Sequence, residues 1–165
     1  MYSNPQICAN CGGHCCKKYP GFYHPSQLGN NDEEINLKLL EMLRTRQYSI
    51  DRWEGDPLYE YDFDEVHAGR QLSHVFMLRP RGCDKPILHD PFFEETTCMF
   101  LGPNGCEIAE DDRPMQCQLL EPTTDKGCIE HNKIGRHAKH EAAILWRPYQ
   151  NMINDAINEM DLWNS

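Results

Sequence analysis

The chain lacks a long hydrophobic run. No stretch approaches the ~18 consecutive apolar residues of a membrane-spanning helix. The first residues, Met1 to Gln6, hold neither the basic region nor the apolar region of a secretory signal peptide. The sequence therefore predicts a cytoplasmic protein without a membrane segment.

Positive charge is also scarce. Lysine and arginine number 16 against 26 aspartate and glutamate residues, and the formal net charge is −10. Binding to a phosphate backbone requires a basic face, and none is visible in the sequence. We therefore expect no nucleic-acid partner.

Several motifs of known enzyme classes are missing. The sequence has no glycine-rich phosphate loop, no nucleophile elbow, no His-Glu-x-x-His helix and no Cys-x3-Cys-x2-Cys signature of radical chemistry. Their absence favours a binding protein but leaves the question of enzymatic activity open.

Cysteine, by contrast, is clustered. The chain has nine cysteines, an odd number, so they cannot all pair with one another. Their share of the residues is below the ~8–10% that is typical of a disulfide framework. In a reducing cytosol such clusters are metal-binding or catalytic rather than structural disulfides. Four cysteines fall within nine positions, and five follow later: Cys8, Cys11, Cys15 and Cys16, then Cys83, Cys98, Cys106, Cys117 and Cys128.

The spacing of the first cluster favours metal. Cys8-x2-Cys11, followed by Gly12, lets two thiolates reach one ion across a tight turn, and soft thiolates select Zn(II), Cu(I) or iron–sulfur units. Disulfide or redox-active thiols, and inert buried cysteines, are the alternatives. Side chains of the adjacent Cys15 and Cys16 diverge, so both joining one tetrahedral ion would be strained. We therefore predict two neighbouring metal centres, or one polynuclear cluster.

The later cysteines would complete these centres. Cys98, Cys106 and Cys117 lie in turn contexts, although a lone cysteine is often a small core residue. Cys128 or His131 could supply a last ligand, and Cys83 is an alternative thiol. His14 is expected outside the ligand set, and His137 and His140 on a solvated helix face. The predicted metal ligands are Cys8, Cys11, Cys15, Cys16, Cys98, Cys106, Cys117 and Cys128.

The pattern of the remaining residues predicts a small single α+β domain over residues 1–165. An amphipathic helix is expected over residues 32–47 behind an N-cap at residues 30–32, with a weak strand at 48–50 and a clearer one at 74–78. Residues 97–101 and 105–108 flank hairpin punctuation.

Helices are expected in the last third of the chain. Acidic residues before Pro114 predict a helix start that places Cys117 about one turn inside, where backbone amides would favour its thiolate. A longer helix is expected over residues 129–147, broken at Pro148. A core-facing stripe follows: Tyr149, Met152, Ile153, Ala156, Ile157 and Met160. Residues 8–25 and 98–128 form the cysteine block, and about 129–163 the C-terminal helical segment.

Five elements in order resemble a known family. They are Cys8-x2-Cys11-x3-Cys15-Cys16, the following Lys17 to Gly21, Cys98-Met99-Phe100-Leu101, Gly105-Cys106-Glu107-Ile108 and Arg113-Pro114-x2-Cys117. Together they resemble the YkgJ family of CxxCxxCC cysteine-cluster proteins. The chain departs from that pattern by having three residues between Cys11 and Cys15, and by the extra Cys83.

The resemblance implies a zinc- or iron-chelating domain. A flagellin lysine methylase with related cysteines is discussed as an iron–sulfur protein, so a redox or protein-modifying enzyme is the alternative function. The vicinal thiols and the nearby aromatic residues Tyr19, Phe22 and Tyr23 would suit it. We favour two Zn²⁺ ions, because a closed four-thiolate zinc site is redox-inert and matches the missing catalytic motifs.

Overall fold

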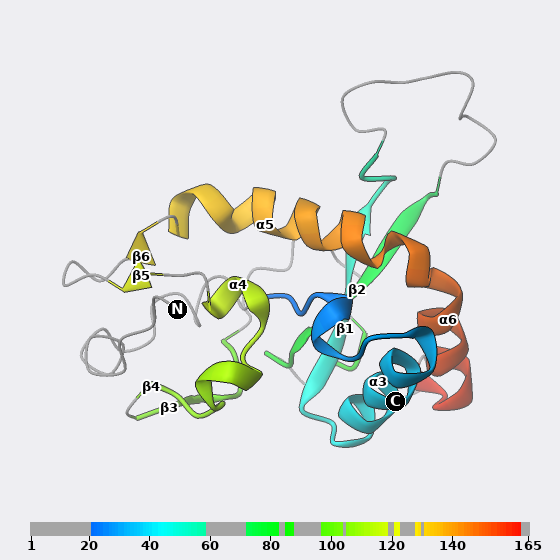
Figure 1. The fold of residues 1–165 in the computed structure, drawn as a ribbon, viewed down its shortest axis with the longest axis horizontal. Helices are drawn as coiled ribbons and strands as arrows, with labels where there is room; N and C mark the ends of the chain where they lie inside the picture. Colours follow the sequence, from blue (N-terminus) through cyan, green and yellow to red (C-terminus); the bar gives the residue numbers. More distant parts are fainter. Residues whose placement is uncertain are drawn as a thin grey trace.

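The structure is built around a two-stranded antiparallel ribbon, β1 (Tyr48–Glu54) and β2 (His74–Pro80). It is a computed structural model that describes residues 21–58, 72–82, 85–87, 97–103, 105–118, 121–122, 128–129 and 131–162. Of residues 116, 121–122, 128–129 and 131–138 only the backbone is described. Helices and small antiparallel sheets together confirm the α+β class (Figure 1).

The two strands pair along their whole length, from Tyr48 opposite Pro80 to Glu54 opposite His74. The clear strand was predicted at residues 74–78, and the weak one at 48–50 proves to be the start of a seven-residue strand. Residues 85–87 run beside β1, where the N–H of Ile50 donates to the Pro86 carbonyl at 2.8 Å. A two-stranded ribbon is marginal alone, so helices must cover it.

Helix α3 (Asp32–Arg44) starts as its sequence predicts. The side chain of Asn31 accepts from the N–H of Glu34 at 2.9 Å, which is an N-cap bond. The helix ends at Arg44 instead of residue 47, because Arg46 takes a left-handed conformation with φ of 61°. Its buried face consists of Ile35, Leu39, Leu40, Met42 and Leu43.

The C-terminal segment contains α5 (His131–Trp146), the 3₁₀ turn η4 (Arg147–Tyr149) and α6 (Gln150–Glu159). The helix expected from residue 129 begins two residues later, because β6 (Cys128–Ile129) pairs with β5 (Glu121–Pro122). Pro148 lies in η4 and interrupts the helix as predicted. The predicted stripe is confirmed: three members are buried and three pack on the core as partly buried side chains, namely Ile153, Ala156 and Ile157, then Tyr149, Met152 and Met160.

A third group of elements carries cysteines. The predicted hairpin is present as β3 (Leu101–Gly102) paired with β4 (Gly105–Cys106). The acidic residues expected to begin a helix instead form the 3₁₀ turn η3 (Glu110–Asp112), and α4 (Met115–Gln118) follows Pro114. Figure 1 shows β3, β4 and α4 together on the opposite side of the ribbon from α3 and α6. The 3₁₀ turn η1 (Pro25–Gln27) precedes α3 in the chain.

In the part of the chain that the structure describes, no helix combines the length and apolar character needed to cross a membrane.

Buried charges hold α5 on the ribbon. The Asp51 carboxylate on β1 faces the Arg79 guanidinium at 3.5 Å and the Lys139 ammonium on α5 at 3.6 Å. Asp51 and Arg79 are both buried. A shift of α5 that separated Lys139 from Asp51 would leave these buried charges without full compensation, which is costly. The contact therefore favours the observed position of α5 on the ribbon.

Asp56 makes a second buried ion pair, with Arg147 of η4. Arg147 donates from Nε to Oδ1 at 3.0 Å and from Nη2 to Oδ2 at 2.9 Å, a bidentate arrangement. The N–H groups of Leu58 and Leu72 also donate to this carboxylate, at 3.1 and 2.9 Å. Burial acts to raise the pKa of Asp56, but the bonds from Arg147, Leu72 and Leu58 outweigh it and hold this pKa below 3.8.

We expect Asp56→Asn to lower the free energy of unfolding by about 3 kcal/mol at neutral pH, because Arg147 then loses its buried anionic partner. The carboxylate of Asp56 has a lower pKa folded than unfolded, so its stabilisation is present above pH 3.8 and is lost as pH falls further. Urea unfolding from neutral to acidic pH should therefore show the difference between variant and wild type shrinking toward low pH.

Glu54→Gln is the matched control. Glu54 pairs with Arg52 at 3.0 Å, but its side chain is 60% exposed. The loss should stay below about 1 kcal/mol, as for surface pairs. Equal losses in the two variants would contradict the role given to Asp56.

Candidate metal centre

Three of the predicted metal ligands have side chains that the structure describes. Cys98 is buried, and its carbonyl accepts from the N–H of Leu101 at 3.1 Å. Cys106 is half-buried on β4, directly opposite Leu101. Cys117 is half-buried on α4, and its N–H donates to the Pro114 carbonyl at 2.8 Å.

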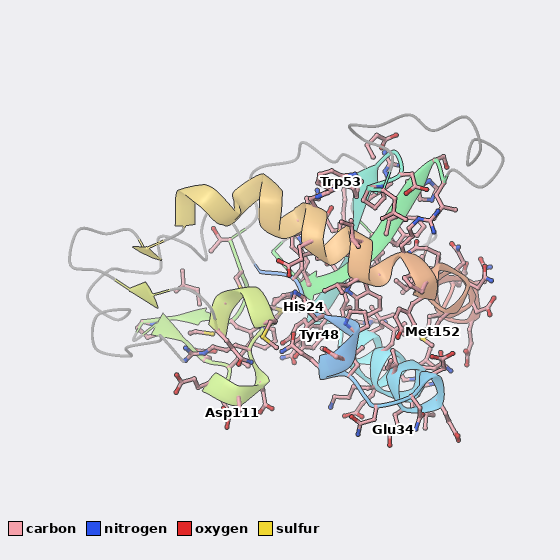
Figure 2. The ribbon with its side chains drawn as sticks, turned by 45° about the horizontal axis from the view of Figure 1, so that its top comes forward. His24, Glu34, Tyr48, Trp53, Asp111 and Met152 are labelled. Carbon is pink, nitrogen blue, oxygen red and sulfur yellow. The ribbon has the colours of Figure 1, made fainter. Side chains whose placement is uncertain are left out.

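A pair of tyrosines lies among these thiols. The rings of Tyr23 and Tyr48 meet edge to face with centroids 5.8 Å apart. The ring centroids of Tyr48 and Phe100 are 5.6 Å apart. The Tyr23 hydroxyl donates to the Asp112 carbonyl at 3.0 Å. Figure 2 shows Tyr48 beside the green segment that carries α4. This aromatic group therefore joins the ribbon to the cysteine-bearing segment.

Electrostatics connects all three thiols to the tyrosine pair. Burial raises the pKa of Tyr23 far above its usual value, and Tyr48 and the charges of Cys117 and Cys106 raise it further. Burial also raises the pKa of Tyr48, although the hydrogen bond with Tyr23 and the charge of Lys38 act to lower it, and the charges of Asp112 and Cys98 add a smaller rise. Both phenols thus stay neutral near pH 7. Both rings serve as apolar cover, and the Tyr23 hydroxyl serves as a hydrogen-bond donor rather than as an acid or base.

His24 follows Tyr23 and has an unusual environment. Its Nε2 atom is buried and has no hydrogen-bond partner among the described residues. Burial lowers the pKa of His24, and the charge of Glu141 only partly opposes this. The imidazole is therefore neutral near pH 7, with a buried nitrogen that costs stability.

The other predicted residues are placed as follows. Outside the described residues lie Cys8, Cys11, His14, Cys15, Cys16 and Cys83. Cys128 belongs to β6, and His131 and His137 belong to α5, each described by its backbone alone. The interpretation of His140 as a solvated residue is wrong: it is half-buried, its ring packs on Trp53 at 5.1 Å and its Nε2 contacts the Pro57 carbonyl at 2.7 Å.

The described residues alone do not form a metal site. Among them, no group of three or more histidine, cysteine, aspartate or glutamate side chains could hold an ion. Cys98, Cys106 and Cys117 lie in the segment whose Phe100 ring contacts Tyr48 and whose Asp112 carbonyl accepts from Tyr23, and soft sulfur ligands suit zinc or iron–sulfur units. Any complete centre must therefore draw ligands from the cysteines outside this part.

Two residues at the site, Tyr48 and Gln27, were not predicted from the sequence. Tyr48 was recognised only as part of a weak strand, and Gln27 carried no signal at all. Gln27 binds the backbone at Arg113 and Met115, far away in the chain. Such side-chain-to-backbone bonds follow no periodicity, so no pattern in the sequence could have found them.

We expect Tyr23→Phe to leave the tyrosinate absorbance of the folded protein unchanged between about pH 9 and about pH 11, where ordinary tyrosines ionise. The reason is that the pKa of Tyr23 is raised well above its usual value of 10.0. The measurement is an ultraviolet pH titration of wild type and variant. A loss of the absorbance change of one tyrosine would contradict the buried position of Tyr23.

Comparisons with protein-family models, with curated proteins and with solved structures find no match to this chain. The resemblance to the YkgJ family, which depends on its cysteine motifs, thus stays a prediction.

Proposed function

We propose that this protein binds metal through its cysteines, in two neighbouring thiolate centres that hold Zn²⁺. The ligands are Cys8, Cys11, Cys15, Cys16, Cys98, Cys106, Cys117 and Cys128. The observation that carries the proposal is that Tyr23 and Tyr48 contact the segment that holds Cys98, Cys106 and Cys117, through the Asp112 carbonyl and the Phe100 ring.

Chain connectivity supports the contribution of the N-terminal cysteines. Gly21 lies five residues after Cys16 and directly precedes the core residues Phe22 and Tyr23. Five residues span at most about 18 Å when extended. The vicinal pair is therefore tethered within reach of the segment whose side chains contact the Cys106–Cys117 region, so the two cysteine groups can meet at low cost in chain entropy.

The surroundings of the thiols favour a closed centre. Cys98 is buried, and Cys106 and Cys117 are half-buried beside neutral aromatic side chains. Such cover excludes water and suits structural zinc, which needs four protein ligands and no open position. The proposal includes a cytoplasmic setting, because reduced thiols are required. It includes neither nucleic-acid nor membrane partners, given the net charge of −10 and the absence of an apolar segment.

An iron–sulfur unit with a redox or protein-modifying role is the competing function. Its cysteine ligands would be of the same type, but it would colour the protein brown and add a reducible centre. Anaerobic purification followed by elemental analysis and a visible spectrum separates the two. The proposal expects two equivalents of zinc per chain and no visible absorption.

We expect the double substitution Cys8→Ser and Cys11→Ser to remove at least one equivalent of zinc and to lower the melting temperature, because thiolate ligands supply folding energy through the metal. Elemental analysis and calorimetry of the purified variant provide the measurement. Unchanged metal content and thermal stability would defeat the proposal, as would wild-type protein without zinc or iron whose thiols are joined in pairs.

Cys83→Ser serves as the matched control, since Cys83 is the one cysteine outside the proposed ligand set. It should retain both zinc equivalents. If Cys83→Ser loses zinc while Cys128→Ser keeps it, the eighth ligand is Cys83 and the two-centre proposal stands with that exchange.

A further inference from the structure

The side-chain amide of Gln27 makes three hydrogen bonds to the main chain. Its Oε1 accepts from the N–H of Met115 at 2.8 Å and from the N–H of His24 at 3.0 Å. Its Nε2 donates to the Arg113 carbonyl at 2.9 Å. The amide thus binds the residues on both sides of Pro114, where the chain enters α4.

These bonds act on the segment that carries Cys117. Met115 is the first residue of α4 and Cys117 the third. Pro114, between the two residues that Gln27 binds, is fully buried. A four-residue helix has little stability of its own, because helix nucleation is costly. The position of the Cys117 thiol therefore depends on contacts from outside α4, and Gln27 supplies two of them.

Gln27 also links the two ends of the cysteine block. Gln27 is the last residue of η1 and follows Cys16 by eleven residues, whereas Met115 precedes Cys117 by two. The neighbouring Tyr23 adds a parallel link through the Asp112 carbonyl at 3.0 Å. Between them, Tyr23 and Gln27 bind three main-chain groups within residues 112–115.

We propose that Gln27 is a positioning residue for the metal centre, fixing the backbone at residues 113–115 so that Cys117 is pre-arranged for metal. This inference rests on the proposed function. Pre-arranged ligands bind metal more tightly, because no binding free energy is lost in ordering them. Loss of groups that orient ligands typically weakens metal affinity by about 10- to 100-fold.

The chain offers a closely matched control in Gln150. Its amide also makes three hydrogen bonds, accepting from the N–H of Phe76 at 2.8 Å and donating to the carbonyls of Phe76 and Trp146 at 2.9 Å each. These bonds join β2 to the C-terminal helices and none reaches the Cys106–Cys117 segment. Gln150→Met and Gln27→Met remove the same kind and number of bonds.

The experiment measures the zinc dissociation constant of each full-length variant by competition with a chromophoric chelator, under reducing and anaerobic conditions. Gln27→Met should raise the constant at least about tenfold, and Gln150→Met by less than about threefold. Melting temperatures of the metal-free proteins report the general structural loss, which should be similar in both. Gln27→Glu, which keeps the accepting oxygens and loses the bond to Arg113, should fall between wild type and Gln27→Met.

A second readout does not require metal. The rate at which iodoacetamide alkylates Cys117 in the metal-free protein, followed by mass spectrometry, should rise in Gln27→Met and not in Gln150→Met, because α4 loses its anchor. Zinc binding by wild type together with equal constants for the two methionine variants would overturn the positioning role alone. Wild type that binds neither zinc nor iron overturns the proposed function, and unchanged alkylation would then show that Gln27 does not fix Cys117.

Discussion

Hydrogen bonds from a few buried or half-buried side chains to distant main-chain groups join the separate parts of this structure. The ribbon of β1 and β2 is too small to organise the whole described chain, and the elements carrying the cysteines are two to four residues long. Backbone polar groups in such irregular segments need partners when they are buried. Tyr23, Gln27 and Gln150 provide them, and Trp146 donates from Nε1 to the Tyr23 carbonyl at 2.7 Å. Metal binding by the cysteines would therefore add to an arrangement that already has internal support.

The segment around Tyr23 is where these constraints converge. The N–H of Tyr23 donates to the Leu78 carbonyl at 3.0 Å, its carbonyl accepts from Trp146, and its hydroxyl reaches Asp112. One residue thus contacts the ribbon, helix α5 and the 3₁₀ turn before α4. The same side chain lies in the electrostatic field of Cys106 and Cys117. Burial of the core and the position of these thiols are consequently coupled through a single tyrosine.

Local features were predictable because they depend on neighbours in the chain. The N-cap of α3, its apolar face, the hairpin at Gly102 and the interruption at Pro148 all follow from residue type and spacing. Predictions failed where pairing or packing with another segment intervened. Ile129, expected to begin the long helix, instead lies in β6, which pairs with β5. His140 is half-buried and not solvated, because its side chain packs on Trp53 and contacts the Pro57 carbonyl, each more than eighty residues away.

The sequence by itself determines the number of cysteines and their spacing. It also supports the prediction that adjacent cysteines bind two different cations, because that prediction depends only on residue type and on covalent geometry. The tertiary structure decided which side chains surround Cys98, Cys106 and Cys117. The ring of Tyr48 contacts Phe100 across 52 positions of sequence. The amide of Gln27 makes hydrogen bonds to residues 113 and 115 across 86 and 88 positions. Contacts of that range arise only when the chain packs, since no local pattern encodes which side chain meets which backbone group.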